Sequence, residues 1–486
     1  MSTSRWRWPT REAFARFWGD LQLAARNLLR NRRRSASTLF ALAIGLTAIL
    51  LFGGFKANIR YSMITTHVRA GGHLQVQHRD FYLYGTGNPS VYGIPRYAEL
   101  VEAIKRDPQL APMVAVVTPR LQLGGVAGNF DAGVSSTVLG VAYVPEDVNR
   151  MRAWNEFSVT LADHPFRLEG AASDAAVIGL GVARVLQLCG RLQVANCPQP
   201  QSAEPAPTGP AKAVPSDIAA LAGLGAPASS GAGPAGAARI ELLSSSGRGA
   251  PNVAALSVVA AEDQGIKELD EVTVILQLPF AQRLVYGRNE PRVTAIMVQL
   301  KQTADMEAAQ RRLETLLSER PSGGPPLAVR TFQELNPFYG QAVRLFDVIF
   351  GFIFALIGGI VLFTVSNTMN AAVVERTVEI GTLRAIGLRR GSLQRLFVLE
   401  GCLIGFCGAV TGIVAGLAIG WLVNHAGITW QPPASSDVIP LHLKIAGENL
   451  TLFGTAFGLM IVAMVSAWWP SYRAARLNVV EALRHA

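Results

Sequence analysis

Residues 366–401 read SNTMNAAVVERTVEIGTLRAIGLRRGSLQRLFVLEG, and they join two long apolar runs. Apolar and charged side chains are interleaved through the middle of the segment, which predicts a short amphipathic helix from about Glu375 to Leu388. Glycines inside the segment bend or end that helix. A charged helix of this length offers a partner both surface and charge, yet it is too small to form a domain. The segment therefore predicts a docking element between two membrane spans.

The apolar runs around this segment belong to a set of four. An uncharged run of about 18 residues or more is long enough to cross a bilayer as a helix. The predicted spans are 38–55, 348–370, 401–423 and 450–469. Half of the chain is hydrophobic and 16% is charged, whereas soluble domains carry about 25% charged residues. We therefore expect a membrane protein with one span, a large domain, and three further spans.

The placement of arginine predicts the orientation of these spans. Nine arginines precede the first span, and more follow spans two and four, whereas Lys444 is the fixed positive charge between spans three and four. The positive-inside rule then orients each segment. We expect segments 1–37, 371–395 and 470–486 to be cytoplasmic. We expect segments 56–345 and 424–449 to lie on the opposite, extracytoplasmic side of the membrane. The net charge of +10 is thus explained by a membrane surface and not by nucleic acid.

The N-terminal segment carries an apolar stripe at helical spacing. Its members are Phe14, Phe17, Trp18, Leu21 and Leu28, with arginines and Asp20 between them. Such a helix either lies in the headgroup layer of the membrane, which we favour, or packs on protein.

Segment 56–345 predicts an α+β domain outside the cytoplasm. Strands are expected at 72–77, 114–123, 136–143, 271–278, 294–301 and 327–331, and helices at 175–188 and 303–319. Residues 198–251 are rich in Pro, Ala, Gly and Ser, which predicts a disordered insertion around a short helix at 216–224.

Two pairs of side chains in this domain are of residue types that can form a disulfide or bind a metal. Cys189 and Cys197 are eight residues apart, and in an oxidising compartment we expect them to form a disulfide. His73 and His78 have no matching ligand pair, so we interpret them as strand-edge or surface residues and expect no metal site. No nucleophile, base and acid set indicates a catalytic centre.

The segment quoted first is similar to a known family signature. Glu379-Ile380-Gly381 followed by Leu383–Gly387 resembles the EIG-x-LRA-x-G motif of permeases of the FtsX, MacB and LolC type. Glu400 and the ending around Pro470, Arg473 and Glu481 also resemble that family, although Val479 stands where many relatives have proline. The resemblance covers residues 25–80 and 332–486 and is weak across the domain between them.

The resemblance implies a mechanism as well as a fold. It implies a dimer of four-span subunits in the bacterial inner membrane, formed by two copies or by two paralogues. It further implies that the helix at 375–388 couples the chain to a cytoplasmic ABC ATPase. The residues that match the coupling motif are Glu375, Glu379, Ile380, Gly381, Arg384, Ala385 and Gly387.

The chain has no phosphate-binding loop of its own. A Walker A loop needs Lys after Gly, and none of the six lysines follows a glycine. We therefore expect no cofactor and no ATP hydrolysis in this chain, with ATP and Mg²⁺ bound by the partner.

Span three carries a glycine stripe. Gly408, Gly412, Gly416 and Gly420 recur every four residues, which predicts a face for close helix packing.

The sequence leaves the substrate open. Release or export of a lipoprotein or another hydrophobic molecule is the favoured function, and an adaptor or lipoprotein on the far side of the membrane is a further expected partner. Drug or peptide efflux and regulation of a cell-wall hydrolase remain alternatives.

Overall fold

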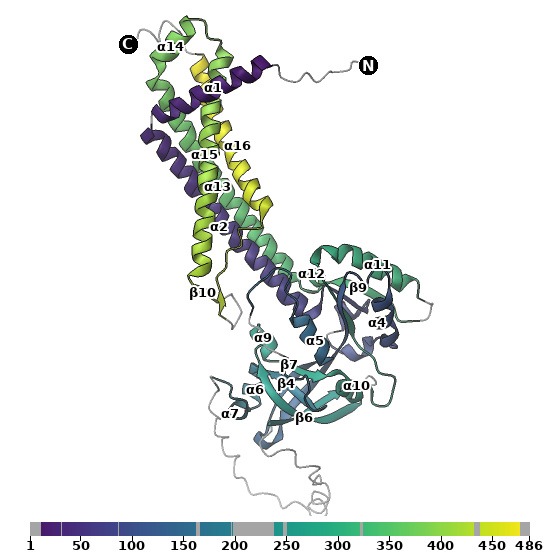
Figure 1. The fold of residues 1–486 in the computed structure, drawn as a ribbon. Helices are drawn as coiled ribbons and strands as arrows, with labels where there is room; N and C mark the ends of the chain where they lie inside the picture. The colour runs from purple at the N-terminus through teal and green to yellow at the C-terminus, as the bar shows by residue number, and fades with distance from the viewer. Residues whose placement is uncertain are drawn as a thin grey trace, which may run out of the picture. The chain divides into compact units, whose positions relative to one another are not determined.

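The computed structural model describes residues 11–30, 32–85, 87–161, 166–195, 197, 238–245, 250–320, 324–431 and 438–476 (Figure 1). The chain divides into two compact units. The first comprises Met1–Ser62, Phe338–Thr429 and Pro440–Ala486, and the second comprises Met63–Pro337 and Trp430–Ile439. The second unit is shorter than the predicted domain 56–345, because the helices that flank it continue past their apolar runs.

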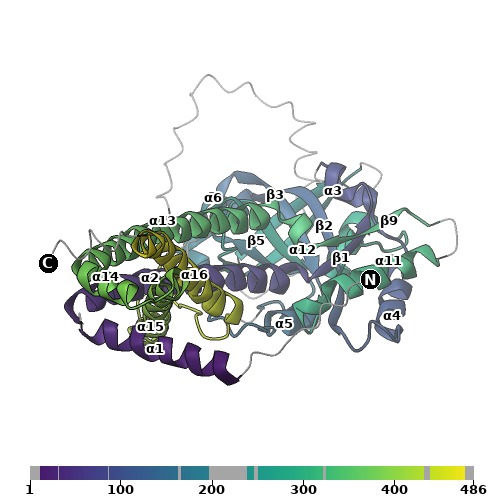
Figure 2. The ribbon, with the colours of Figure 1, turned by 90° about the horizontal axis from the view of Figure 1, so that it is seen from above.

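The first unit is a helical bundle. Its elements are α1 (Arg11–Arg30), the first part of α2 (Arg32–Gly71), α13 (Pro337–Glu375), α14 (Thr377–Ala385), α15 (Arg390–His425) and α16 (Asn449–Ala475). Four of these helices, α2, α13, α15 and α16, are long and apolar enough to cross a membrane. Each of them contains one predicted span. They run side by side in Figure 1 and are gathered together in Figure 2.

Side chains from all four long helices form the core of the bundle. Its buried members include Leu42, Leu46, Ile49 and Leu50 of α2, Val361, Val365 and Met369 of α13, Ile404 of α15, and Leu459, Ala463 and Ala467 of α16. Because lipid is as apolar as these side chains, close packing and not the hydrophobic effect holds such helices together.

Helix α1 packs partly on protein. Leu28 lies against the bundle core, whereas Trp18 is 53% exposed. The protein-packing alternative is therefore confirmed for Leu28, and the headgroup-layer alternative stays a prediction. The side chains of Phe14 and Phe17 lie outside the described residues.

The second unit is built on a mixed β-sheet. Within the described residues the strand order is β3-β7-β4-β6-β5-β2-β8-β1-β9. The strands are β1 (Leu74–His78), β2 (Val114–Asn129), β3 (Val134–Tyr143), β4 (Ala175–Gly179), β5 (Ala238–Ser245), β6 (Pro251–Glu262), β7 (Thr273–Gln277), β8 (Ala295–Leu300) and β9 (Leu327–Thr331). The pairs β3–β7 and β4–β6 are parallel, and the other pairs are antiparallel.

Strand β2 belongs to two parts of this sheet. Its first half pairs with β8 and its second half with β3 and β5. Helices surround the strands and bury one continuous apolar core. They are α3 (Phe81–Tyr84), α4 (Tyr97–Arg106), α5 (Pro145–Arg152), α6 (Leu180–Val185), α7 (Cys189–Leu192), α9 (Lys267–Asp270), α10 (Leu278–Tyr286), α11 (Met306–Ser318) and α12 (Phe332–Leu335), with 3-10 turns at Pro89–Tyr92, Phe130–Ala132 and Thr303–Asp305. Two short strands, β10 (Thr429–Trp430) and β11 (Ile439–Pro440), pair between α15 and α16.

Two sequence-based predictions of secondary structure were wrong in part. Within the predicted helix at 175–188, residues Leu180–Val185 do form the helix α6. The predicted helix at 175–188 begins as β4, whose five residues are all buried between β6 and β7. A strand buried on both faces has no polar alternation, so its apolar run resembles that of a helix. The predicted disordered insertion 198–251 contains β5, in which buried and exposed residues alternate strictly. The predicted helix at 216–224 lies outside the described residues.

Candidate functional site

The candidate site is α14, the short helix that the sequence analysis predicted as a docking element. The chain breaks its helical path at Arg376, where φ is −105° and ψ is 17°, and α14 starts one residue later. The helix ends with paired bonds from Leu388 N to Leu383 O at 3.0 Å and from Gly387 N to Arg384 O at 3.1 Å. This is a Schellman ending, which needs a residue in the left-handed region after the cap. Gly387 supplies it with φ of +103°.

The inner face of α14 packs on three other helices. Ile380 is 3% exposed and belongs to a cluster of buried side chains from α13, α15 and α16. The other members are Val373, Leu393, Phe397, Ala474 and Ala475. Gly381 is buried beside Ile380. These two motif residues therefore hold α14 in place and do not present a surface to a partner.

The far end of α14 is anchored by an arginine. The Nη1 of Arg384 donates a hydrogen bond to the carbonyl oxygen of Ala475 at 2.7 Å. Ala475 is the last residue of α16, where unpaired carbonyls and the helix dipole favour a cation. Arg384 is thus engaged within the chain, in contrast to the outward role that the motif suggested for it.

The outer face of α14 and its flanks is apolar as well as charged. The exposed apolar side chains are Val374 (73%), Val378 (37%), Leu383 (42%), Ile386 (80%) and Leu388 (38%). Ala385 and Gly387 are also exposed. None of these apolar residues was among the predicted site residues. The sequence could have indicated them, because apolar residues occur on both faces of the predicted amphipathic helix.

The two motif glutamates pair with arginines from the N-terminal region. Glu379 lies 2.9 Å from Arg30, and Glu375 lies 2.8 Å from Arg34. The glutamate side chains are 48% and 50% exposed, so water competes for both pairs. Exposed pairs contribute about 0–1 kcal/mol, which leaves these carboxylates available for exchange with another cation.

The glycine stripe of α15 packs mainly on α2. A Cβ atom on each glycine would lie close to a side chain of the neighbouring chain segment. The distances are 2.7 Å from Gly408 to Leu42, 2.8 Å from Gly412 to Leu46, 3.2 Å from Gly416 to Leu50 and 2.8 Å from Gly420 to Ile445. The stripe therefore forms a contact within the bundle.

The cysteine pair and His73 of the second unit are engaged within the fold. Cys189 and Cys197 are joined by a disulfide, with Cα atoms 6.2 Å apart. The interpretation of His73 as a strand-edge or surface residue was wrong, since it is fully buried, accepts from Leu300 N at 3.0 Å and stacks edge-on against Trp154. No cluster of three or more His, Cys, Asp or Glu that could hold a metal occurs in the part of the chain that the structure describes.

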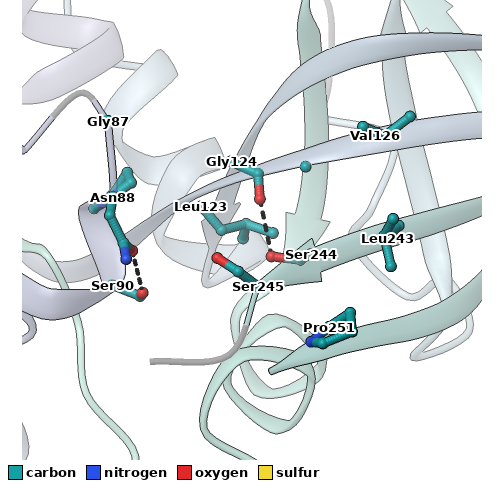
Figure 3. Close-up of a pocket in the computed structure, with 12 residues that line it drawn as sticks. Gly87, Asn88, Ser90, Leu123, Gly124, Val126, Leu243, Ser244, Ser245 and Pro251 are labelled. Carbon is teal, nitrogen blue, oxygen red and sulfur yellow. Dashed lines mark hydrogen bonds between the residues drawn. The ribbon is translucent and has the colours of Figure 1, made fainter. Parts of the chain in front are cut away.

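A pocket of about 380 Å³ lies in the second unit between β2, the ends of β5 and β6, and residues 87–90 (Figure 3). None of the residues that line it is charged. Ser244 donates to the Gly124 carbonyl at 2.9 Å, and Ser90 donates to Asn88 Oδ1 at 2.7 Å. No residue that lines the pocket is a His, Asp, Glu or Lys, so none of its serine hydroxyls has a general base beside it among these residues.

Comparison with known proteins finds the same family as the sequence motif in α14 indicated. Residues 348–479, which include α14, match the family described as FtsX-like permease C-terminal. The match assigns this segment of the chain to that family. The chain is 29% identical over 230 residues to the macrolide export ATP-binding/permease protein MacB of Sodalis glossinidius, covering 46% of the chain and 32% of the relative.

Two further relatives match a similar share of the chain. It is 26% identical over 245 residues to the lipoprotein-releasing system transmembrane protein LolC of Neisseria meningitidis serogroup B, covering 48% of the chain and 56% of LolC. It is 24% identical over 229 residues to an uncharacterized ABC transporter permease of Methanocaldococcus jannaschii, covering 44% and 51%. The matched region thus covers about a third to just over a half of the length of these relatives. The comparisons confirm the resemblance to the FtsX, MacB and LolC type of permease.

Proposed function

We propose that this chain is the transmembrane subunit of an ABC transporter and that a separate ATPase binds the outer face of α14. The observation that supports the proposal most directly is the 80% exposure of Ile386 at the end of α14, a helix whose inner face is packed and on which Val378 and Leu383 are also exposed. Large apolar side chains displayed together at a surface are characteristic of an interaction site. The ATPase would bind ATP and Mg²⁺.

The energy available from this face suits a specific contact. Full burial of an Ile, Leu or Val side chain contributes about 1.5–3 kcal/mol, so three such side chains can act as the anchors of an interface. Glu375 and Glu379 lie in the same segment of the chain, and they can exchange their intramolecular arginines for cations of the partner. The apolar side chains would then supply affinity and the carboxylates orientation.

The packing of α14 suggests how motion would spread. Its inner face contacts α13, α15 and α16, so a displacement of α14 by the ATPase would be passed to those helices. The orientation expected from arginine placement puts α14 in the cytoplasm of a bacterial inner-membrane protein and the second unit on the opposite side. Permease dimers, as two copies or two paralogues, would work in this way with a pair of ATPases.

The substrate is proposed to be a lipoprotein or another hydrophobic molecule, handled at the membrane and not through a polar channel. The four predicted spans contain no charged residue, so they offer no ion path. Similarity to LolC supports this choice, and similarity to MacB supports efflux of a drug as the alternative. An ATP-dependent ion current through the reconstituted protein would contradict the proposal.

The experiment is purification from the native host in mild detergent, with identification of the co-purifying proteins by mass spectrometry. The wild-type chain is expected to bring an ABC ATPase, and Ile386→Glu to lose it at least tenfold because a charge cannot enter an apolar contact. Val91→Glu is the matched control, since Val91 is 57% exposed in the second unit. A lipoprotein, an adaptor or a hydrolase in the preparation would show which of the alternative functions this chain has. A preparation without any ATPase, repeated after crosslinking, would refute the proposal.

A further inference from the structure

A buried polar cluster lies where α14 leaves α13. Arg376 occupies the break between the two helices, and its Nη1 lies 3.2 Å from Glu400 Oε1 of α15. Its Nη2 donates to the carbonyl oxygen of Asn27 in α1 at 3.1 Å. The amide of Asn27 in turn donates to Glu400 Oε1 at 2.6 Å. Three residues, through their side chains and the backbone carbonyl of Asn27, thus connect α1, the α13–α14 break and α15 in a closed ring.

This cluster differs in burial from the other ion pairs around α14. The side chains of Arg376 and Glu400 are 12% and 3% exposed, whereas those of Arg30 and Glu379 are 68% and 48% exposed. Water and salt compete with an exposed pair, but a desolvated pair cannot separate without leaving a charge unpaired in a medium of low dielectric. Of the pairs described here, the buried one therefore restrains the position of the break.

The position of Arg376 gives this restraint a consequence for motion. A residue with non-helical backbone between two helices is where a change of angle between them is absorbed. Because its side chain is tied to α15 and to α1, rotation of α14 at this point must move those helices or be resisted by them. A well-packed apolar trio would stabilise the bundle equally well, so stability alone does not account for a buried charge here.

We propose that Arg376, Glu400 and Asn27 form a pin that fixes the pivot of α14 and transmits its movement to α15 and α1. The pin rests on the proposed function, since it acts on motion that the ATPase produces. These are positioning residues: they act through α14 and touch neither nucleotide nor substrate. In this arrangement α1 is part of the transmission and not only a membrane-surface helix.

The test separates positioning from stability by removing both charges at once. Arg376→Met combined with Glu400→Leu leaves no unpaired charge, and Asn27 is half-buried, so water can replace its lost partners. The complex of this double variant with the co-purifying ATPase is expected to keep its thermal midpoint and its KM for ATP, while kcat for ATP hydrolysis falls about tenfold. Glu400→Gln alone is expected to lower the yield of folded protein, because it leaves Arg376 buried without a counter-charge.

Two further variants complete the test. Asn27→Ala removes the bond to Glu400 and keeps the bond from Arg376 to the backbone carbonyl of residue 27. It therefore weakens the link to α1 and is expected to lower kcat about threefold with the complex intact. Arg473→Met removes an exposed arginine of α16 and is the control, expected to behave as wild type. If the double variant does not assemble, Asn27→Ala decides, and its having the wild-type kcat would overturn the pin.

The outcomes distinguish this proposal from the one on which it rests. A stable double variant with the kcat of the wild type would show that the cluster is only structural and would overturn the pin alone. A wild-type preparation that contains no ATPase would overturn the proposed function, and the pin with it.

Discussion

Gly412 of α15 lies directly against Leu46 of α2. A Cβ atom on Gly412 would be 2.8 Å from the Cβ of Leu46 and 3.1 Å from the backbone oxygen of Ala43, closer than side chains normally approach. Thr47 strengthens this contact by donating to the Gly412 carbonyl at 3.2 Å. The two helices can therefore approach this closely only where α15 has no side chain.

Gly412→Ala is predicted to destabilise the bundle. The added methyl group must push α15 and α2 apart, and overpacking of this kind costs about 1–3 kcal/mol. The thermal midpoint of the purified protein in detergent should fall accordingly. Gly454→Ala in α16 is the matched control: a Cβ there meets nothing within 4 Å, so its midpoint should stay or rise. Equal behaviour of the two variants would contradict the packing role.

Arg384→Ala is predicted to impair coupling more than Glu379→Ala. Arg384 holds the end of α14 on the carbonyl of Ala475, whereas Glu379 makes an exposed pair with Arg30. Loss of a charge-assisted hydrogen bond costs about 1.5–3 kcal/mol, against about 0.2–1 kcal/mol for an exposed pair. The measurement is ATP hydrolysis by the complex with its ATPase. A larger loss in Glu379→Ala would show that the partner contact of Glu379 outweighs the anchor.

The Cys189–Cys197 disulfide is predicted to stabilise the second unit. It closes a loop with a sequence separation of 8, for which the loop-entropy relation gives about 2–3 kcal/mol. Wild type with reductant should unfold like the Cys189→Ser, Cys197→Ser double variant without reductant. If the double variant remained sensitive to reductant, its two other cysteines, Cys402 and Cys407, would be the cause.

His73 is predicted to make stability depend on pH. Burial lowers the pKa of His73 from 6.5 to about 4, and its Nδ1 must stay unprotonated to accept from Leu300 N. The unfolded chain binds the proton more readily, so the stability is present above pH 6.5 and is lost as the pH falls toward 4. About 2 kcal/mol should be lost between pH 7.5 and pH 5.

The measurement is denaturant unfolding of the full chain at both pH values. His73→Asn should flatten this part of the pH dependence, since the Asn side-chain oxygen can accept from Leu300 N without titrating. His425→Asn, at the exposed end of α15, should leave it unchanged. If the free energy of unfolding of His73→Asn depended on pH as strongly as that of the wild type, groups other than His73 would be responsible for the pH dependence.

The spans and α14 were predictable because their signals are local. An uncharged run of membrane length, or a charged helix bounded by glycine, can be recognised within about 20 residues of sequence. The same local reasoning failed for β4 and β5. The first has no alternation because neighbours cover both of its faces, and the second lies inside a stretch whose average composition hid its alternation.

The roles of single residues in α14 needed the fold. Arg384 and Ala475 are 91 positions apart, and Asn27 and Glu400 are 373 apart, so nothing near either residue indicates its partner. For the same reason the motif could not show that Ile380 faces inward while Ile386 faces outward. His73 likewise became a buried residue only through strands that the chain forms more than 200 positions later.

The sequence by itself determined the membrane class, the four apolar helices, the family motif and the close-packing face of Gly408–Gly420. These follow from composition and spacing along one helix, which do not depend on distant neighbours. The tertiary structure alone decided which motif residues anchor α14, which remain exposed for a partner, and that Arg376 meets Glu400 and Asn27 at the helix break. Burial and charge pairing are properties of the space between elements, and only the packed chain defines that space.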